Sequence, residues 1–375
     1  MAHIGLNAHL LSAQAGYRSA GIHGYIYHTL NALPTVKPDW EYTVLVGEGQ
    51  PPDHPQIHVE RSHFKTTSPL RRIFWEQMIQ PRVLKHLNID LYHALAFVAP
   101  PRLKLPLVVT VYDLTFIRYP EALSRARRLY LQTFTRRTCE QAAAIIAISE
   151  STADDIVQLL HIPREKIVVA VPGVSDQFQP VDAAAIETFR QQRNLPSRFL
   201  LHLGTLEPRK NLVMLLRAYA DLPASIREEV HLVLAGGKGW LYDEIFETVN
   251  RLHLQDVVHF PGFVNSVELP LWYNAADALV YPSLFEGWGL PVVEAMACGC
   301  PTLVSDISSL PEAAGDTGLR LPPGDVSAWT DAMLLAITDQ RWRHNSREAG
   351  LSRAYQFTWQ ATAAATIQAY QRALR

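Results

Sequence analysis

The amino-acid sequence predicts an α/β protein built from two doubly wound parallel sheets. Runs of apolar and β-branched residues, such as 107–112, alternate with helix-like segments along the chain. This alternation is typical of parallel sheets covered by helices on both faces. A more polar stretch, residues 179–198, interrupts the alternation, which starts again at residue 199. With 375 residues, the chain is long enough for two domains of ordinary size.

The first half begins with a strand and continues as an alternating series. We expect its first helix from residue 21 to about residue 33. A later helix is expected at 152–160, with Ser149 or Ser151 as its N-cap. The predicted strands of this half are residues 4–8, 42–46, 91–93, 107–112, 144–148 and 166–173.

The second half repeats the pattern. Pro291 suits the first position of a helix at 292–298, and Gly299 suits its C-terminal cap. An alanine-rich segment at 359–374 predicts a final helix. The other elements predicted here are strands at 199–203, 232–235, 257–260, 278–280 and 301–305, and helices at 211–220 and 241–252.

Composition places the chain among ordinary globular proteins. Apolar residues make up 48% of it and the formal net charge is −2, which argues against a general nucleic-acid binder. Cys139, Cys298 and Cys300 lack the spacing of a metal site, so we expect small buried thiols and a reducing cytoplasm. We find no signal peptide pattern in the first residues and no window long and apolar enough for a spanning helix.

The segment before the predicted strand at 301–305 carries the strongest functional signal. It contains a glycine-rich loop and then a helix start, where the backbone N–H groups of Gly289 and Leu290 form a prepared anion site. Glu286 lies in the loop, and Glu294 lies about one turn into the helix. Because a carboxylate beside a phosphate is repelled, we expect neither glutamate to contact the phosphates. Glu294 is placed to accept hydrogen bonds from adjacent hydroxyls of a sugar. The alternative is that Glu294 only complements the helix dipole.

Glu286 and Glu294 form an E-x7-E pattern in the run S-L-F-E-G-W-G-L-P-V-V-E-A-M-A-C-G-C-P. This run resembles the signature of the retaining glycosyltransferases of family 4, which have the GT-B fold. Further matching motifs follow in order at residues 204–212, 232–236, 262–264 and 310–316. The resemblance implies two Rossmann-like domains facing across a cleft. They are an acceptor-binding domain at 1–190 and a nucleotide-sugar-binding domain at 191–355, and a C-terminal helix at 356–375 packs back on the first domain.

The resemblance places the donor site in the C-terminal half. Glu294 would hold the nucleotide ribose, and Glu286 would contact the hydroxyls of the donor sugar. Arg209 and Lys210 would stabilise the leaving diphosphate, since cations can offset charge there without proton transfer; the alternative is a solvated loop pair. Many relatives carry an arginine where this chain has Thr205, and Arg209 is a candidate to replace it. The other donor-binding candidates are Gly204, Phe263, Gly287, Gly289, Leu290 and Pro291.

Three residues of the N-terminal half are candidates for contact with the acceptor or the diphosphate. Gly21 would let the backbone approach a phosphate or an acceptor closely, and the alternative is an ordinary helix cap. Asp113 follows a strand and would orient an acceptor hydroxyl or stabilise positive charge at the sugar ring. Its alternative is a turn cap before Leu114. His93 lies at another strand end, where a lone histidine is more often structural than ligand-binding.

Two basic clusters with apolar interleaving lie in the first half. On amphipathic helices they could bind anionic lipid headgroups or a lipid diphosphate acceptor. The alternative is a solvated helix face paired with Glu121 and Glu140. The clusters are Arg71, Arg72, Ile73, Phe74 and Trp75, and Arg125, Arg127, Arg128, Leu129, Tyr130, Leu131, Phe134, Arg136 and Arg137.

The predicted function is transfer of a hexose from a nucleotide sugar to a hydroxyl of a glycan or lipid-linked acceptor in cell-surface polysaccharide synthesis. Residues 204–212 are most similar to bacterial mannosyltransferases that use GDP-mannose, with UDP- and dTDP-sugars left open. We expect no metal and no cofactor, because Arg209, Lys210 and the helix start offset the diphosphate. Front-face displacement is the expected route, and Asp113 as a covalent nucleophile is the alternative.

Two other classes remain open. One is a different enzyme on a similar fold, such as an epimerase or a sugar phosphorylase; a phosphorylase that uses pyridoxal phosphate needs a buried lysine, which we do not expect here. The other is a non-catalytic relative that binds nucleotide or glycan, which Thr205 and Tyr112 leave open and which Glu286, Glu294 and Lys210 argue against. We expect a cytoplasmic protein, with peripheral contact at the inner face of the membrane left open.

Overall fold

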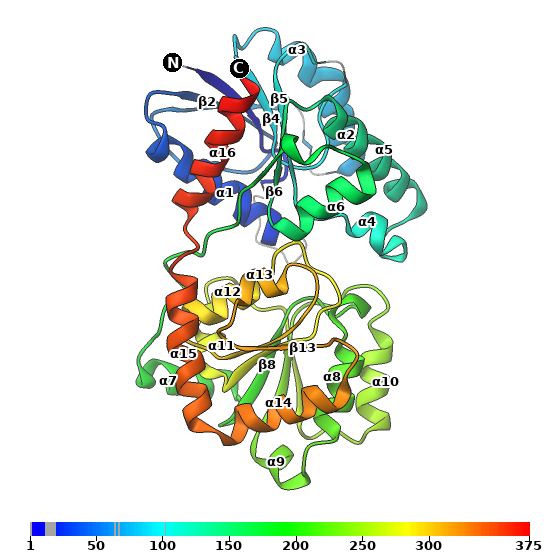
Figure 1. Cartoon of the computed structure of the whole chain (residues 1–375), viewed down its shortest axis with the longest axis vertical. Coiled ribbons are helices and arrows are strands. Elements are labelled where there is room, and N and C mark those ends of the chain that lie inside the picture. The colour runs from blue at the N-terminus through cyan, green and yellow to red at the C-terminus, as the bar shows by residue number, and fades with distance from the viewer. Residues whose placement is uncertain (1, 12–19, 64, 67, 102) are drawn as a thin grey trace. The chain divides into compact units, whose positions relative to one another are not determined.

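The fold is described from a computed structural model, which describes residues 2–11, 20–63, 65–66, 68–101 and 103–375. The chain divides into two compact units (Figure 1). Unit 1 contains Met1–Gly173 together with Thr358–Arg375, and unit 2 contains Val174–Phe357. Each unit has its own parallel sheet, as the alternation of the sequence predicted.

Unit 1 is built on a seven-stranded sheet with the order β3-β2-β1-β4-β5-β6-β7, and every pair in it is parallel. Neighbouring residues of one strand enter opposite cores, as Val108 and Val109 show, so helices cover both faces. The strand β3 was not predicted, because only its first residue is buried. The strands are β1 (His3–Asn7), β2 (Glu41–Val46), β3 (Ile57–Arg61), β4 (Leu91–Ala94), β5 (Leu107–Val111), β6 (Ala144–Ala147) and β7 (Ile167–Val169).

The C-terminal helix α16 (Trp359–Ala373) belongs to unit 1, as predicted, and packs against α1 (Ala20–Val36). Its Trp359 ring stacks on His28 with 4.8 Å between ring centroids. In α6, Ser149 is the N-cap and accepts a 2.9 Å hydrogen bond from the Thr152 N–H. The other helices of the unit are α2 (Pro69–Phe74), a π-helical turn (Trp75–Ile79), α3 (Gln80–Leu84), α4 (Thr115–Arg118), α5 (Arg125–Gln141) and α6 (Glu150–Leu160), with short 3-10 turns at Pro120–Ala122 and Arg164–Lys166.

Unit 2 is built on a six-stranded sheet with the order β10-β9-β8-β11-β12-β13. Its strands are β8 (Phe199–Leu203), β9 (His231–Ala235), β10 (Val258–Gly262), β11 (Ala278–Tyr281), β12 (Thr302–Ser305) and β13 (Leu319–Leu321). Its helices are α7 (Ala183–Arg193), a 3-10 turn (Pro208–Lys210), α8 (Leu212–Ala220), α9 (Ala224–Glu229), α10 (Asp243–Arg251), α11 (Leu269–Ala275), α12 (Leu290–Ala297), α13 (Leu310–Ala314), α14 (Val326–Thr338) and α15 (Gln340–Ala354).

The polar stretch that the sequence analysis took as a crossing between domains contains helix α7, which packs within unit 2. Its Phe189 ring meets Trp272 of α11 edge to face, with 5.4 Å between ring centroids. Ahead of the helix, the Val181 N–H donates a 3.0 Å hydrogen bond to Asn274 Oδ1. Unit 2 therefore begins at Val174 rather than after residue 190, and it ends at Phe357 rather than at residue 355.

All three cysteines are free thiols in the buried interior, as the sequence analysis expected. In the part of the chain that the structure describes, no helix is both long enough and apolar enough to cross a membrane.

Candidate active site

The site of unit 2 lies where the order of its strands reverses. β8 pairs with β9 on one side and with β11 on the other, and such a switch point at the carboxyl ends of the strands is where ligands bind in open α/β sheets. Gly204 follows β8, and its N–H donates a 2.9 Å hydrogen bond to the Ala235 carbonyl. A Cβ at Gly236 would lie 1.8 Å from the Gly204 carbonyl oxygen, so only glycine fits this crossing.

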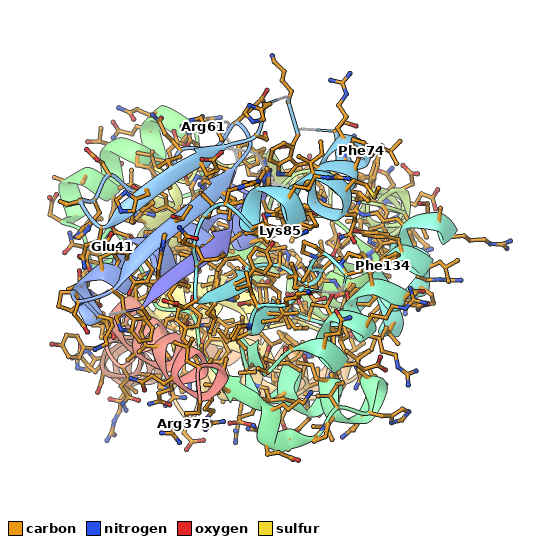
Figure 2. The ribbon with its side chains drawn as sticks, turned by 90° about the horizontal axis from the view of Figure 1, so that it is seen from above. Glu41, Arg61, Phe74, Lys85, Phe134 and Arg375 are labelled. Atoms are coloured by element: carbon orange, nitrogen blue, oxygen red, sulfur yellow. The ribbon has the colours of Figure 1, made fainter. Side chains whose placement is uncertain are left out.

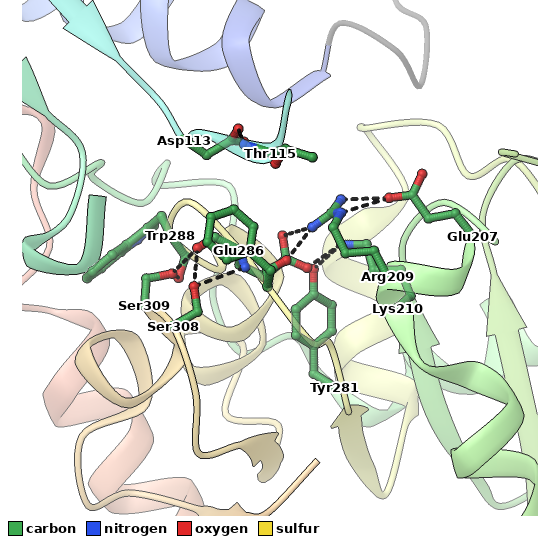
Figure 3. A network of polar contacts seen from close by, with 11 residues as sticks. Asp113, Thr115, Glu207, Arg209, Lys210, Tyr281, Glu286, Trp288, Ser308 and Ser309 are labelled. Carbon is green, nitrogen blue, oxygen red and sulfur yellow. Dashed lines mark hydrogen bonds and ion pairs between the residues drawn. The ribbon is translucent and has the colours of Figure 1, made fainter. Parts of the chain in front are cut away.

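Two cations from the turn after β8 converge on one carboxylate from the loop after β11 (Figure 3). The Lys210 Nζ lies 2.5 Å from Glu286 Oε1, and the Arg209 Nη1 lies 3.0 Å from Glu286 Oε2. The Lys210 ammonium also donates a 2.9 Å hydrogen bond to the Tyr281 hydroxyl. Arg209 forms a second ion pair, 2.7 Å long, with Glu207. The sequence analysis named these cations and Glu286 separately, and the structure brings them together.

The electrostatics of this cluster keep Glu286 ionised. Burial by itself would raise the pKa of Glu286, but the charges of Arg209 and Lys210 outweigh burial and lower this pKa to about 2. Burial lowers the pKa of Lys210, against the attraction of Glu286. Lys210 is only 6% exposed, so the expectation that the chain has no buried lysine was wrong. Because this ammonium is paired with a carboxylate, it serves as a fixed charge rather than as a free amine.

The loop that carries Glu286 is held by backbone contacts on both sides. The Arg209 guanidinium donates to the Phe285 carbonyl, and the Arg209 carbonyl accepts a 2.8 Å hydrogen bond from the Leu284 N–H. The hydroxyls of Ser308 and Ser309 both donate to the Glu286 carbonyl, at 2.7 and 2.9 Å. This clamp fixes the backbone of the loop, so the carboxylate is positioned before any ligand binds.

Helix α12 starts directly after the loop. Gly289 is its N-cap with φ of 109°, a left-handed conformation that favours glycine, and a Cβ there would lie 2.8 Å from Leu310 Cδ2. The helix begins at Leu290, so Pro291 occupies its second position rather than the predicted first. Since proline has no N–H, the donors at this helix start are the backbone groups of Gly289 and Leu290.

Glu294 lies further along α12 and has a different environment from Glu286. The buried Tyr273 hydroxyl donates a 2.8 Å hydrogen bond to Glu294 Oε2. Burial raises the pKa of Glu294 to about 7, and this single hydrogen bond only partly opposes the shift. The residue as a whole keeps partial solvent exposure.

The remaining donor-site candidates lie in loops at the same end of the sheet. Thr205 and Gly287 are partly exposed in the loops after β8 and β11. Phe263 follows β10 directly and is half exposed. Their predicted contacts with a donor remain predictions. Within residues 2–11, 20–63, 65–66, 68–101 and 103–375, no three side chains of His, Cys, Asp or Glu are grouped so that they could hold a metal ion.

The three candidates of unit 1 have local explanations. The Asp113 carboxylate accepts a 2.8 Å hydrogen bond from the Thr115 N–H, the turn cap that the sequence left as an alternative (Figure 3). His93 is 1% exposed, and its ring nitrogens contact the Tyr370 hydroxyl at 2.7 Å and the Thr110 hydroxyl at 2.8 Å. This geometry favours the structural alternative for His93. Gly21 is exposed in the first turn of α1, where a Cβ would meet nothing within 4 Å.

Several residues that shape the site were missed by sequence reasoning. Tyr281 and Tyr273 hold Lys210 and Glu294, and Ser308 and Ser309 hold the loop. A signal was available for Glu207, which lies two residues before Arg209 in the same motif, and for Tyr281, which lies directly after the predicted strand 278–280 and five residues before Glu286. The others come from elements whose place beside the site depends on the folded chain.

Comparison with known proteins agrees with this geometry. The family model described as Glycosyltransferase Family 4 matches residues 20–178, and the one described as Glycosyl transferases group 1 matches residues 185–353. The O-antigen chain mannosyltransferase B of Escherichia coli is 35% identical over 300 residues, which cover 79% of this chain and 78% of the relative.

Solved structures share the fold across nearly the whole chain. Sucrose-phosphate synthase from Thermosynechococcus elongatus matches with a TM-score of 0.78 and 21% identity, covering 99% of this chain and 98% of that one. HepE from Anabaena, in complex with UDP and glucose, matches with a TM-score of 0.74 and 19% identity, covering 99% and 100%. Fold and site together thus define a GT-B glycosyltransferase. More narrowly, the chain belongs to glycosyltransferase family 4, as its motifs predicted.

Proposed function

We propose that this glycosyltransferase transfers mannose from GDP-mannose, with retention of configuration, to a hydroxyl of a glycan or lipid-linked acceptor in cell-surface polysaccharide synthesis. One observation carries the proposal: Arg209, Lys210 and Glu286 converge beside the start of α12. The choice of mannose is supported by the 35% identity to an O-antigen chain mannosyltransferase.

Each charged group has a distinct task in this proposal. The donor's diphosphate takes over from Glu286 as the counter-charge of Lys210 and Arg209, and these cations then offset the charge that develops as the diphosphate leaves. The released Glu286 oxygens accept hydrogen bonds from hydroxyls of the donor sugar. Glu294 accepts hydrogen bonds from the ribose hydroxyls. With two cations and a helix start available for the diphosphate, we propose transfer without a metal or a cofactor.

The proposed reaction balances without a protein nucleophile. The bond between the anomeric carbon and the diphosphate oxygen breaks as the acceptor oxygen bonds to the same face of that carbon, and the leaving phosphate takes the acceptor's proton. Asp113 as a covalent nucleophile is the alternative route. In an Asp113→Ala variant, azide rescue that gives a product of inverted configuration would favour that route, whereas substantial residual activity would exclude it.

We further propose a cytoplasmic enzyme that contacts an anionic membrane surface through unit 1. Leu70, Phe74 and Met78 are exposed at intervals of four residues along α2 and the π-helical turn, and Arg125 and Arg127 of α5 are exposed as well. Figure 2 labels Phe74. Binding to vesicles containing anionic lipid should fall when Phe74 is replaced by glutamate. Equal binding to neutral vesicles would contradict the electrostatic part of this proposal.

The decisive experiment is thermal stabilisation by GDP, UDP, dTDP and ADP. A ligand that binds only the folded protein raises the free energy of unfolding by roughly 2.7 kcal/mol at a hundredfold excess over its Kd. We expect GDP to stabilise the protein and Glu294→Ala and Lys210→Ala to remove the effect. Stabilisation by UDP alone would support the transferase activity but replace GDP-mannose with a UDP-sugar as the proposed donor. This outcome is relevant because HepE is solved with UDP.

Product analysis completes the test. The enzyme is incubated with the mannose or glucose donor that carries the stabilising nucleotide. The anomeric NMR signal of the product then reports whether the configuration is retained. Activity in the presence of a chelator tests whether the transfer needs a metal. No nucleotide stabilisation and no turnover with any of these donors would contradict the proposed function and favour a non-catalytic relative.

A further inference from the structure

A second switch point, in unit 1, carries a polar cavity that the donor site does not use. In that sheet β1 pairs with β2 on one side and β4 on the other, so the order reverses between β1 and β4. A cavity of about 60 Å³ lies at this edge, lined by Asn7 at the end of β1, by residues 96–98 after β4, and by side chains of α2, the π-helical turn and α5. Figure 2 labels Phe74 on α2 and Phe134 on α5, the two helices that contribute to the lining.

The centre of this cavity is a carboxyl group with incomplete neutralisation. Glu76 accepts a 3.3 Å hydrogen bond from Asn7 Nδ2, and its nearest cation, Arg72 Nε, is 4.0 Å away. The Glu76 side chain is 11% exposed and that of Arg72 is 25% exposed. Burial raises the pKa of Glu76 to about 7, more than Arg72 and Asn7 lower it. A buried carboxyl with so few partners is costly unless a ligand supplies hydrogen bonds.

Two further polar atoms of the lining are buried and have no hydrogen-bond partner among the described residues. They are His9 Nε2, on a ring that is 7% exposed, and the Tyr130 hydroxyl. The other His9 nitrogen contacts the Thr66 hydroxyl at 3.1 Å. Burial and the charge of Arg72 lower the pKa of His9 to about 4, so this ring is neutral at pH 7.

The backbone around the cavity has features that are frequent at functional sites. Glu76 is carried by the π-helical turn Trp75–Ile79, and such turns often mark functional positions. Phe97, which also lines the cavity, has φ of 54°, a left-handed conformation that is strained for a bulky residue. Both features lie beside the two polar atoms that have no partner among the described residues.

The chemistry of the lining selects the ligand. An anion would face the Glu76 carboxyl, and Arg72, 4.0 Å from that carboxyl, is the one cation among the described lining residues, so a phosphate is disfavoured. An apolar group would leave His9 Nε2 and the Tyr130 hydroxyl without hydrogen-bond partners. Sugar hydroxyls both donate and accept, and they match a carboxylate acceptor, a guanidinium donor, a neutral imidazole and a phenol. The volume holds several water-sized groups, which fits one edge of a sugar ring with its hydroxyls.

We propose that this cavity, formed by Asn7, His9, Arg72, Glu76 and Tyr130, binds the hydroxyl groups along one edge of the acceptor's terminal sugar. This inference rests on the proposed function, because it assigns the specificity of the acceptor to a defined set of side chains in unit 1. These residues recognise non-reacting hydroxyls and are specificity residues rather than catalytic ones.

The test uses the full chain and measures the affinity of methyl α-D-mannopyranoside, methyl α-D-glucopyranoside and methyl β-D-N-acetylglucosaminide by saturation-transfer NMR. We expect at least one glycoside to bind. Tyr130→Phe and Glu76→Gln change little volume, and each should weaken this binding by roughly tenfold or more. The first removes a hydroxyl, and the second replaces one acceptor oxygen of the carboxyl group with an NH2 donor. GDP stabilisation should be unchanged in both variants.

The matched control is Tyr42→Phe. The Tyr42 hydroxyl is also buried in unit 1, but it bonds to the Leu33 and Lys37 carbonyls. This variant should lose stability and keep glycoside affinity. If Tyr130→Phe and Glu76→Gln change only stability, or if inorganic phosphate binds and is lost in these variants, the proposal is overturned. Absence of glycoside binding beside normal nucleotide stabilisation also overturns it, whereas absence of any nucleotide binding contradicts the proposed function itself.

Discussion

Glu286 and Glu294 are eight residues apart in one loop and helix, yet the fold gives them opposite ionisation. Glu286 meets two cations, and its pKa falls to about 2. Glu294 meets one tyrosine hydroxyl, and burial raises its pKa to about 7. Both carboxyls lie away from bulk water, so the difference comes from the charges placed beside them. Counter-charge, rather than position along the sequence, determines which carboxylate is fixed and which can still take up a proton.

The Glu76 carboxyl of unit 1 is a third case that resembles Glu294. Its nearest cation is 4.0 Å away, and its pKa also rises to about 7. The Glu286 cluster is therefore preorganised before a ligand binds, whereas Glu294 and Glu76 have hydrogen-bonding capacity left for hydroxyl groups. Three changes, ordered by expected effect, would sharpen or break this contrast.

The largest effect is expected for Glu286→Gln. It leaves the buried Lys210 ammonium without its carboxylate, and breaking a buried ion pair in this way costs about 3–5 kcal/mol of unfolding free energy. Urea denaturation measures the loss. The double variant Glu286→Gln/Lys210→Met should recover part of it, because no isolated charge remains. If Glu286→Gln were as stable as the wild type, the prediction that the buried Lys210 ammonium needs the Glu286 carboxylate would be contradicted.

Lys210→Met should preserve the fold better and reduce the rate more selectively. Removing one preorganised stabiliser of developing charge typically lowers kcat by about 10²–10³. Initial rates with a saturating donor measure the loss. The control is Lys166→Met, since the Lys166 ammonium donates hydrogen bonds to two backbone carbonyls of unit 1, those of Glu140 and Ala142. Equal losses in both variants would contradict a role for Lys210 at the leaving group.

The smallest effect is expected for Glu294→Gln, and it depends on pH. In the wild type, the folded pKa of about 7 lies above the ordinary glutamate pKa of 4.5, so the folded state binds more protons between these two pH values. Unfolding free energy therefore falls as pH rises from about 4.5 to 7. The variant lacks this contribution, so its stability should fall less over this range and exceed the wild type's at pH 8.

Nucleotide affinity should change in the opposite direction. Wild-type affinity for GDP should rise as pH increases through about 7, because the ionised Glu294 is the better acceptor for ribose hydroxyls. In Glu294→Gln this rise should vanish, and affinity at pH 8 should be roughly tenfold lower. Calorimetric titration at pH 6 and pH 8 measures both effects. An unchanged pH dependence in the variant would assign the titration to a group other than Glu294.

Local features of the site were predictable because they depend on neighbouring residues. The alternation of apolar runs predicted both parallel sheets, and Ser149 was correctly expected as a helix cap. The motif around Glu286 and Glu294 predicted the loop and helix α12, with the helix start misplaced by one position at Pro291. Short-range sterics and capping determine such features, so they can be read from a few consecutive residues.

Contacts between distant segments were decided only by the tertiary structure. Glu286 is separated by 76 residues from Lys210, and His93 by 277 residues from Tyr370. Residues 174–190 have the composition of a linker but belong to unit 2. The Phe189 ring of this stretch packs on Trp272 of unit 2. The Glu76 cavity joins segments that no motif connects. A pKa depends on burial and on charges through space, and both are set by which segments the fold brings together. The sequence by itself thus determined the architecture and the family and named the residues predicted to surround the donor, whereas the tertiary structure decided the partners and the charge states of those residues.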